Sequence, residues 1–406
     1  MKLVVGAGRT VLGALEPCSG DGSIVVLECA RRIEERGLVA YLDALPSVRA
    51  LITAPGDELP QEPDRLAALL AAAEVRPRLT AVLPALEEGV VAAAVAADLL
   101  GLPGAGVRAA RVFRDKALLR SVADDAGIAG PRWREIGDAA ALAAALAELP
   151  GPGHVLKPLG ASGSRGVLRL GAGDDPAAAW ADAVGAVGTA RFLVEELMVG
   201  PEVSVESLVS DGRTLFWNPT LKDVQPGPHP VEVGHVLPGR LPGREAALLR
   251  ESTDALIKAA GFGTGVLHSE WILTAAGPAL VECAARIPGD RITDLLTEAY
   301  GFPFIAAYAD LMAGAEPAIP SRAARAAAIR FLTPEPAAAV TVAGQADALA
   351  VPGVTEVRID AAEKLEVRPL HSSADRVGHV LATGPDPEAA RTAAREGAAR
   401  IRFGAA

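Results

Sequence analysis

Apolar runs alternate with amphipathic stretches over roughly the first hundred residues. Residues 2–5, 23–27, 49–53 and 80–84 read as buried strands, while 30–36, 63–73 and 87–100 show helical periodicity. Strands that alternate with helices form a parallel sheet covered by helices. The pattern therefore predicts an N-terminal parallel α/β layer over residues 1–108.

The remaining chain predicts α+β structure in two further parts. Residues 109–195 form a small module in which two apolar runs, 154–159 and 166–170, flank a glycine-rich loop. Residues 196–406 read as an antiparallel sheet, with an appendage from about residue 320. The sheet and appendage are expected from strands at 202–209, 214–217, 267–273, 279–283, 328–332, 340–342, 354–359 and 379–382, with helices at 244–260, 293–300, 304–313 and 386–402.

The glycine-rich loop follows directly after Lys157. Its residues, Gly160 to Arg165, leave backbone amides free to converge on phosphate oxygens, and two serines add hydroxyl donors. The order GxxxxGK[ST] of a Walker A loop is absent, and a strand rather than a helix follows. The loop predicts a nucleotide-binding flap, although a plain hairpin turn has the same composition.

A second glycine pair, Gly6 and Gly8, stands at the end of the first strand. A dinucleotide fingerprint needs a third glycine three residues later, where this chain has Val11. We therefore expect an ordinary turn here and no NAD binding.

The hairpin around Gly277 predicts two carboxylates side by side. Residues 270 and 282 are equally far from its centre at 276, which makes Glu270 and Glu282 cross-strand neighbours. Two like charges in this arrangement repel each other and must be neutralised. A divalent cation could do this, or Arg286 could form a buried ion pair with them. Without paired histidines or cysteines, a cation here would be Mg²⁺ or Mn²⁺ rather than zinc.

Composition narrows the classes of partner. The 406 residues carry a formal charge of −11, which argues against nucleic acid as the main partner. No segment is both uncharged and long enough to cross a bilayer, so we expect no membrane partner. Three scattered cysteines indicate neither a disulfide framework nor a zinc site, and they fit a reducing cytoplasm. We therefore expect a cytoplasmic protein, and from base rates a homodimer.

Several blocks in fixed order resemble the ATP-grasp ligases. These blocks are RDK at 114–116, KPLGASGSRGV at 157–167, VEELMVGPE at 194–202, HSEW at 268–271 and VECAAR at 281–286, and the likeness extends from Glu87 to Gly384. The ECAAR block resembles the L-amino-acid ligase branch, which joins amino acids into dipeptides. The resemblance implies an ATP-grasp fold in which the module 109–195 is the lid and 196–406 carries the catalytic sheet.

The same resemblance implies roles for individual residues. Lys116 and Lys157 would contact the α- and β-phosphates, and the flap residues Ser162, Gly163, Ser164 and Gly166 would close over the β- and γ-phosphates. Glu195 and the backbone of Glu196, Leu197 and Met198 would meet the adenine, and Glu202 the ribose. Glu270 and Glu282 would hold the metal with phosphates and water, since Ala284 replaces the asparagine ligand of D-alanine ligases. A solvated charge pair at 195 and 196, or a surface Glu202, is the plain alternative.

The chemistry that follows is carboxylate activation. ATP would phosphorylate a carboxylate to an acyl phosphate, and an amine would attack it. The catalytic residues would be Arg286, which neutralises the acyl phosphate or the oxyanion formed on amine attack, and Lys157, which contacts the phosphates. Lys222, His235, His268, Trp271 and Arg286 are candidate substrate residues, His268 being equally readable as a structural histidine.

The expected function is thus an ATP- and Mg²⁺- or Mn²⁺-dependent ligase for small carboxylate and amine substrates, forming a peptide bond. The alternatives are an ATP-grasp enzyme with a purine-precursor or bicarbonate acceptor, and an ATP-binding protein without catalysis.

Overall fold

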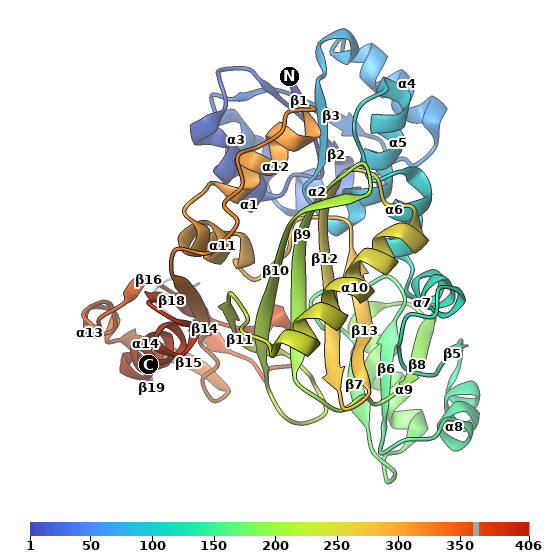
Figure 1. The fold of residues 1–406 in the computed structure, drawn as a ribbon, viewed down its shortest axis with the longest axis vertical. Coiled ribbons are helices and arrows are strands. Elements are labelled where there is room, and N and C mark those ends of the chain that lie inside the picture. The colour runs from blue at the N-terminus through green and yellow to red at the C-terminus, as the bar shows by residue number, and fades with distance from the viewer. Residues whose placement is uncertain (360–364, 406) are drawn as a thin grey trace.

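The structure is a computed structural model that describes residues 1–359 and 365–405 (Figure 1). Its N-terminal layer is the parallel α/β unit that the sequence predicts. The sheet has the strand order β3-β2-β1-β4, and all its neighbouring strands run parallel. Its elements are β1 (Lys2–Val5), α1 (Arg9–Leu15), β2 (Ile24–Cys29), α2 (Ala30–Glu35), α3 (Leu38–Asp43), β3 (Val48–Ala54), α4 (Pro63–Ala72), β4 (Ala81–Pro84) and α5 (Val90–Leu100). The helices α1 and α3 were not predicted.

Two helices lead into a small antiparallel module at the lower right of Figure 1. Its sheet has the order β5-β8-β6-β7, and α8 and α9 pack on it around a core that contains Leu142, Leu156, Ala183 and Phe192. The predicted hairpin is present, with His154 opposite Leu170. The elements are α6 (Val107–Arg114), α7 (Lys116–Asp125), β5 (Trp133–Ile136), α8 (Ala139–Glu148), β6 (His154–Pro158), β7 (Leu168–Leu170), α9 (Pro176–Val187) and β8 (Phe192–Glu196).

The large sheet has eight strands in the order β13-β12-β9-β10-β11-β14-β18-β16. Its last three strands come from the predicted appendage, which therefore extends the sheet instead of standing apart from it. The elements are β9 (Glu202–Ser210), β10 (Arg213–Val224), β11 (Glu232–Leu237), α10 (Gly243–Ala260), β12 (Gly265–Thr274), β13 (Gly277–Ala284), α11 (Ile292–Tyr300), α12 (Phe304–Met312), β14 (Ala326–Phe331), β16 (Val354–Ile359) and β18 (Gly378–Gly384).

A three-stranded sheet and two helices complete the C-terminal part. The sheet order is β17-β15-β19. The elements are β15 (Ala337–Ala343), α13 (Gln345–Leu349), β17 (Leu365–Val367), α14 (Pro387–Arg400) and β19 (Arg402–Ala405). The strand β11 was not predicted because Gly234 and His235 interrupt the alternation of its apolar residues.

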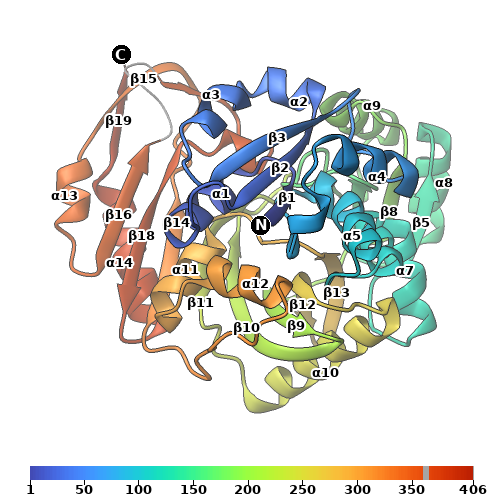
Figure 2. The same ribbon diagram turned by 90° about the horizontal axis from the view of Figure 1, so that it is seen from above.

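Two hydrophobic cores join the N-terminal layer to the large sheet. In one, Val4 and Leu83 of the N-terminal sheet share a cluster with Phe304 and Tyr308 of α12, and Figure 2 shows α12 beside α1. In the other, Leu3 and Val95 share a cluster with Trp271 of β12. These cores fix the N-terminal layer against the sheet that carries the candidate site. Among the described residues, no helix is both long and apolar enough to cross a membrane.

Candidate active site between the flap hairpin and the large sheet

A cavity of about 350 Å³ separates the small module from the large sheet. It is lined by the predicted flap, by both predicted phosphate-binding lysines and by both predicted metal ligands. Its lining also includes Lys222, His235, Arg286, Asp290 and Ser373. One cavity therefore brings together side chains that lie more than two hundred residues apart in sequence.

The flap is the loop between β6 and β7. Gly163, Ser164 and Gly166 have φ angles of 68°, 56° and 72°, a left-handed region that favours glycine. A side chain at 166 would also meet Val187 Cγ1 of α9 at 2.9 Å, so glycine is required there. Lys116, in the first turn of α7, donates from Nζ to the carbonyl oxygen of Ala161 at 2.9 Å and thereby holds the flap.

Lys157 lies on β6 and is buried at the floor of the cavity. Its Nζ contacts Glu195 Oε2 at 2.8 Å and donates to the carbonyl oxygen of Val281 at 3.1 Å. Burial lowers the pKa of Lys157 to about 8, because removal from water disfavours the ammonium more than Glu195 favours it.

Glu195 forms ion pairs with Lys157 and with Arg120. Its carboxylate is gripped at both oxygens by Arg120, at 2.8 and 3.2 Å, and Arg120 also donates to the carbonyls of Leu280 and Val281. Burial would raise the pKa of Glu195, but Arg120 and Lys157 hold it below its ordinary value. Glu195 also lines the cavity, so its predicted contact with the adenine would come from a carboxylate already bound by Arg120 and Lys157. Glu196, Leu197 and Met198 line the cavity as expected, although the Glu196 carboxylate accepts from Arg132 Nε at 3.1 Å.

Glu270 and Glu282 are cross-strand partners in β12 and β13. The turn is centred between residues 275 and 276 and not on 276, since Thr274 pairs with Gly277, and a bulge between Glu270 and Trp271 restores the expected pairing. The extra residue is Val281, and its carbonyl is the one that receives Lys157 and Arg120. The bulge thus ties the carboxylate pair to the lysine of the flap hairpin.

Separate cations balance the two carboxylates. Glu282 Oε1 lies 3.1 Å from Lys116 Nζ, and Glu270 Oε1 lies 3.1 Å from Lys222 Nζ. Arg286 does not pair with Glu282, because its Nε contacts Glu87 Oε2 at 2.6 Å. Glu87 also accepts from Arg114, which fixes Arg286 between the N-terminal layer and the cavity. The expected partner Arg286 is therefore wrong, and Lys116 and Lys222 form the ion pairs instead.

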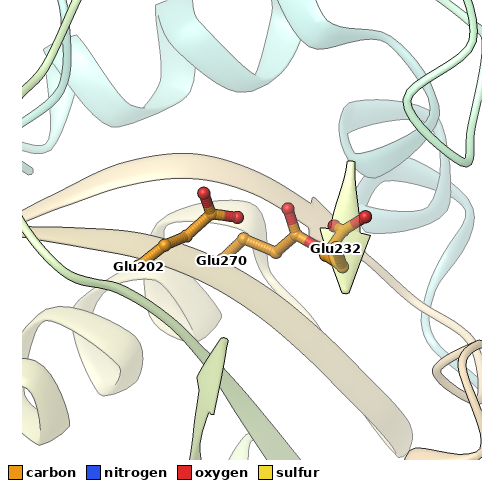
Figure 3. Close-up of side chains that lie close together, drawn as sticks. All are labelled: Glu202, Glu232 and Glu270. Atoms are coloured by element: carbon orange, nitrogen blue, oxygen red, sulfur yellow. The ribbon is translucent and has the colours of Figure 1, made fainter. Parts of the chain in front are cut away.

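Lys222 contacts three carboxylates, which Figure 3 shows close together. Glu202, Glu232 and Glu270 each offer an oxygen, and these oxygens lie within 4.8 Å of one another. Lys222 Nζ lies 2.7 Å from Glu202 and 2.9 Å from Glu232, in addition to its contact with Glu270. Burial opposes the charge, yet the carboxylates raise the pKa of Lys222 well above its ordinary value. The carboxylate of Glu202, which is predicted to bind the ribose, thus already forms an ion pair with the ammonium of Lys222.

His268 connects Glu270 to a buried polar network. Its Nδ1 lies 3.0 Å from Glu206 Oε1 and its Nε2 lies 3.1 Å from Glu270 Oε1. Glu206 also accepts hydrogen bonds from Ser204, Asn218 and Thr220. Burial opposes protonation, but the two carboxylates raise the pKa of His268 to about 9. The imidazolium therefore supports Glu270, which favours the structural interpretation of His268, although it also lines the cavity.

Trp271 was expected beside the substrate, and this expectation is wrong. Its side chain is fully buried in the core that joins the sheet to the N-terminal layer, and its Nε1 donates to Ser269 Oγ at 2.8 Å. Side chains alternate along a strand, so Trp271 faces away from the side on which His268 and Glu270 lie.

Several lining or supporting residues escaped the sequence analysis. Arg120, Glu232 and Asp290 gave no motif of their own, and each reaches the site through partners that are far away in sequence. A weak signal existed for Glu232 and Asp290, since they stand close to His235 and Arg286, which were singled out.

The donors at Glu270 and Glu282 fit a magnesium-type ion. Both are carboxylates, their side chains are 20% and 32% exposed, and they lie side by side facing the cavity that the flap covers. Ala284, which also lines the cavity, adds no donor. Lys116 would give up its contact with Glu282 when an ion takes that place.

Comparisons with known proteins agree with this geometry. Residues 152–294 match the family described as ATP-grasp domain, and residues 330–406 match L-amino acid ligase C-terminal domain 2. A phosphoribosylamine–glycine ligase of Leifsonia xyli is 30% identical over 326 residues, which cover 75% of this chain and 76% of that protein. The uncharacterised protein y4rH of Sinorhizobium fredii is 26% identical over 300 residues, but the match spans 72% of this chain and only 61% of that protein.

A crystal structure of an L-amino acid ligase from Bacillus licheniformis shares the fold with a TM-score of 0.78. It is 18% identical, and the match covers 100% of this chain and 98% of that one. The chain therefore belongs to the ATP-grasp family, and its residues 330–406 match the C-terminal domain of L-amino acid ligases. Members of this family use ATP with Mg²⁺. The predicted family and fold are confirmed.

Proposed function

We propose that this protein is an ATP-dependent ligase that activates the carboxylate of one amino acid as an acyl phosphate and joins it to the amine of a second. The products would be a dipeptide, ADP and phosphate. The observation that carries the proposal is the shared cavity, in which the flap hairpin, the Glu270–Glu282 pair and Arg286 meet. Such a cavity can place a nucleotide phosphate beside a carboxylate.

The nucleotide would occupy the part of the cavity nearest the flap. Lys116 and Lys157 would contact its α- and β-phosphates, and Ser162, Ser164 and the amides of Gly163 and Gly166 would cover the β- and γ-phosphates. The segment Glu196–Met198 would receive the adenine through its backbone, and Glu202 the ribose.

Glu270 and Glu282 would hold Mg²⁺ or Mn²⁺, which when bound neutralises charge on the phosphoryl group in transfer. A carboxylate alone is a poor acyl donor because its leaving group would be oxide, so phosphorylation supplies a better one. Arg286, anchored by Glu87, presents charge to the acyl phosphate and to the oxyanion formed when the amine attacks.

The small module would act as a lid that keeps water from the acyl phosphate. The boundaries 1–108, 109–195 and 196–406 remain our proposal for the domains. We further propose a cytoplasmic enzyme and a homodimer, which await direct tests.

Substrate contacts would fall at the end of the cavity beyond the metal site. Lys222, Glu232 and His235 would line this part of the cavity, and His268 would hold Glu270 beside them through its Nε2 contact. The match of residues 330–406 to the L-amino acid ligase C-terminal domain favours amino acids over other acceptors.

The test is to incubate the purified protein with Mg²⁺, ATP and pairs of amino acids, and to measure phosphate release and product mass. Phosphate and a condensation product that both require two amino acids would support the proposal. Turnover that instead requires bicarbonate or an aminoribonucleotide would contradict it, and binding of ATP without turnover under any pair would indicate a non-catalytic protein.

A further inference from the structure

His235 lies at the substrate end of the cavity with one ring nitrogen engaged and one free. It is on β11, opposite Lys222 of β10 and Ile329 of β14. Its Nε2 lies 3.0 Å from Asp290 Oδ2, and its side chain is only 1% exposed. The other nitrogen, Nδ1, has no hydrogen-bond partner among the residues that the structure describes. A buried polar atom normally has a partner, and His235 is among the residues that line the cavity, so a bound ligand is the candidate partner for Nδ1.

Asp290 is held firmly in place behind the ring. Its backbone has a left-handed φ of 56°, followed by Arg291 at 60°, conformations that non-glycine residues adopt only where the surroundings enforce them. Both carboxylate oxygens of Asp290 are bound by the guanidinium of Arg376. Burial would raise the pKa of Asp290, but Arg376 and His235 hold it well below its ordinary value. Asp290 is therefore a carboxylate that accepts the Nε2–H of His235.

Arg376 comes from the C-terminal domain and is itself fixed. Its guanidinium lies 3.8 Å from the centre of the Phe331 ring. The His235 ring packs edge-on against the same phenyl ring, with 5.8 Å between their centroids. Arg376 also donates to the carbonyl oxygen of Ser373, whose own N–H donates to the flap carbonyl of Gly163 at 3.2 Å. The segment 373–376 thus contacts the flap through Ser373 and contacts Asp290, the partner of His235, through Arg376.

The charged groups around His235 come from four elements. Lys222 is its neighbour on β10, Glu232 precedes it on β11, Asp290 binds it from the loop before α11, and Arg376 lies before β18. His379 packs on Phe331 at 6.4 Å. Because Asp290 accepts from Nε2, a neutral His235 carries its lone pair on Nδ1.

We propose that His235 is the base that accepts a proton from the acceptor amine, and that Asp290 and Arg376 are positioning residues that hold it for this step. The inference rests on the proposed function and assigns a task to the C-terminal domain. An amino acid enters as an ammonium ion and cannot attack until it loses a proton. His235 Nδ1 takes that proton and becomes an imidazolium whose Nε2–H remains bonded to Asp290.

The amine lone pair then forms a bond to the acyl carbon, and the bond from that carbon to the phosphate oxygen breaks with its electron pair. The second proton of the nitrogen leaves with the phosphate. No oxidant or further reactant is required, and the imidazolium returns its proton to water when the products depart.

The experiment compares two nucleophiles on the full-length enzyme. Hydroxylamine is largely unprotonated at neutral pH and needs no base, so hydroxamate formation reports carboxylate activation alone, while dipeptide formation also reports deprotonation. At saturating acceptor, His235→Gln should lower kcat for the dipeptide roughly 100-fold. Its hydroxamate rate should fall much less than its dipeptide rate, so the ratio of dipeptide to hydroxamate should drop.

Arg376→Gln should also lower the rate of dipeptide formation much more than the rate of hydroxamate formation. Arg376→Lys should restore part of the dipeptide rate. Arg402→Gln is the matched control, since this arginine is in the same domain, is 67% exposed and contacts only Asp347 among the partners found for its side chain. It should leave both rates unchanged.

Equal loss of both products in His235→Gln, or a rise in acceptor KM without a fall in kcat, would overturn the assignment. So would an Arg376→Gln enzyme with a wild-type ratio of dipeptide to hydroxamate. If the wild type itself makes hydroxamates but no dipeptide with any amino acid, the proposed acceptor class is wrong. If it makes neither product, carboxylate activation fails, and both proposals fall together.

Discussion

ATP binding should weaken as the pH rises through about 8, because Lys157 then loses its charge. This lysine is buried beneath the flap, and its pKa is lowered to about 8 by desolvation, with Arg120 opposing and Glu195 supporting the ammonium. The displacement from the ordinary value of 10.5 corresponds to roughly 3 kcal/mol of disfavoured charging. ATP itself is fully ionised in this range, so the enzyme supplies the titrating group.

The magnitude follows from the fraction of protonated lysine. At pH 7 nearly all of Lys157 is charged, and at pH 9 about one tenth is, so the Kd for ATP should rise roughly tenfold between these values. The measurement is isothermal titration of the nucleotide at constant Mg²⁺ and ionic strength from pH 6.5 to 9.5.

A matched variant isolates the cause. Lys157→Arg keeps a charge that does not titrate in this range, so its Kd should be larger but nearly constant with pH. An identical slope in wild type and Lys157→Arg, or a wild-type Kd that does not change between pH 7 and 9, would refute the reasoning.

Three other changes test separate parts of the site. Glu282→Gln should abolish turnover yet retain ATP binding, and unchanged turnover would contradict the metal assignment. His268→Gln should destabilise the fold by a few kcal/mol at pH 6, as measured by urea unfolding, and should flatten the pH dependence of stability. That dependence is expected because the pKa of His268 is raised to about 9, so its contribution is complete below about 6.5 and is lost as the pH rises through 9. Arg120→Leu leaves Glu195 and two carbonyls without their donor, and it should lower the free energy of unfolding by about 3–5 kcal/mol, a loss that circular dichroism during denaturation would show or exclude.

The local pattern predicted the parts of the fold that local forces determine. The alternation of apolar runs predicted the parallel layer, and the glycine-rich stretch predicted the flap hairpin, since both signals lie within short windows. The pairing of Glu270 with Glu282 was also expected, but for an incomplete reason. The turn is centred between residues 275 and 276, and only the bulge at Val281 brings the two glutamates opposite each other.

The supports of the site could not be predicted because they depend on tertiary contacts. Arg120 reaches Glu195 across 75 residues, and Arg376 reaches Asp290 across 86, so no window of sequence contains both partners. Lys222 was singled out from its block alone, whereas its three carboxylate partners come from three different strands. The error at Trp271 was avoidable, since alternation along a strand places it opposite to Glu270.

The central claim is that a carboxylate becomes an acyl phosphate in the cavity between the flap and the Glu270–Glu282 pair. The most direct measurement uses an amino acid labelled with ¹⁸O in its carboxylate and follows the label by mass spectrometry of the inorganic phosphate. The account predicts that each phosphate released with ADP carries one labelled oxygen from the activated amino acid. Unlabelled phosphate, or the label recovered in AMP, would contradict it.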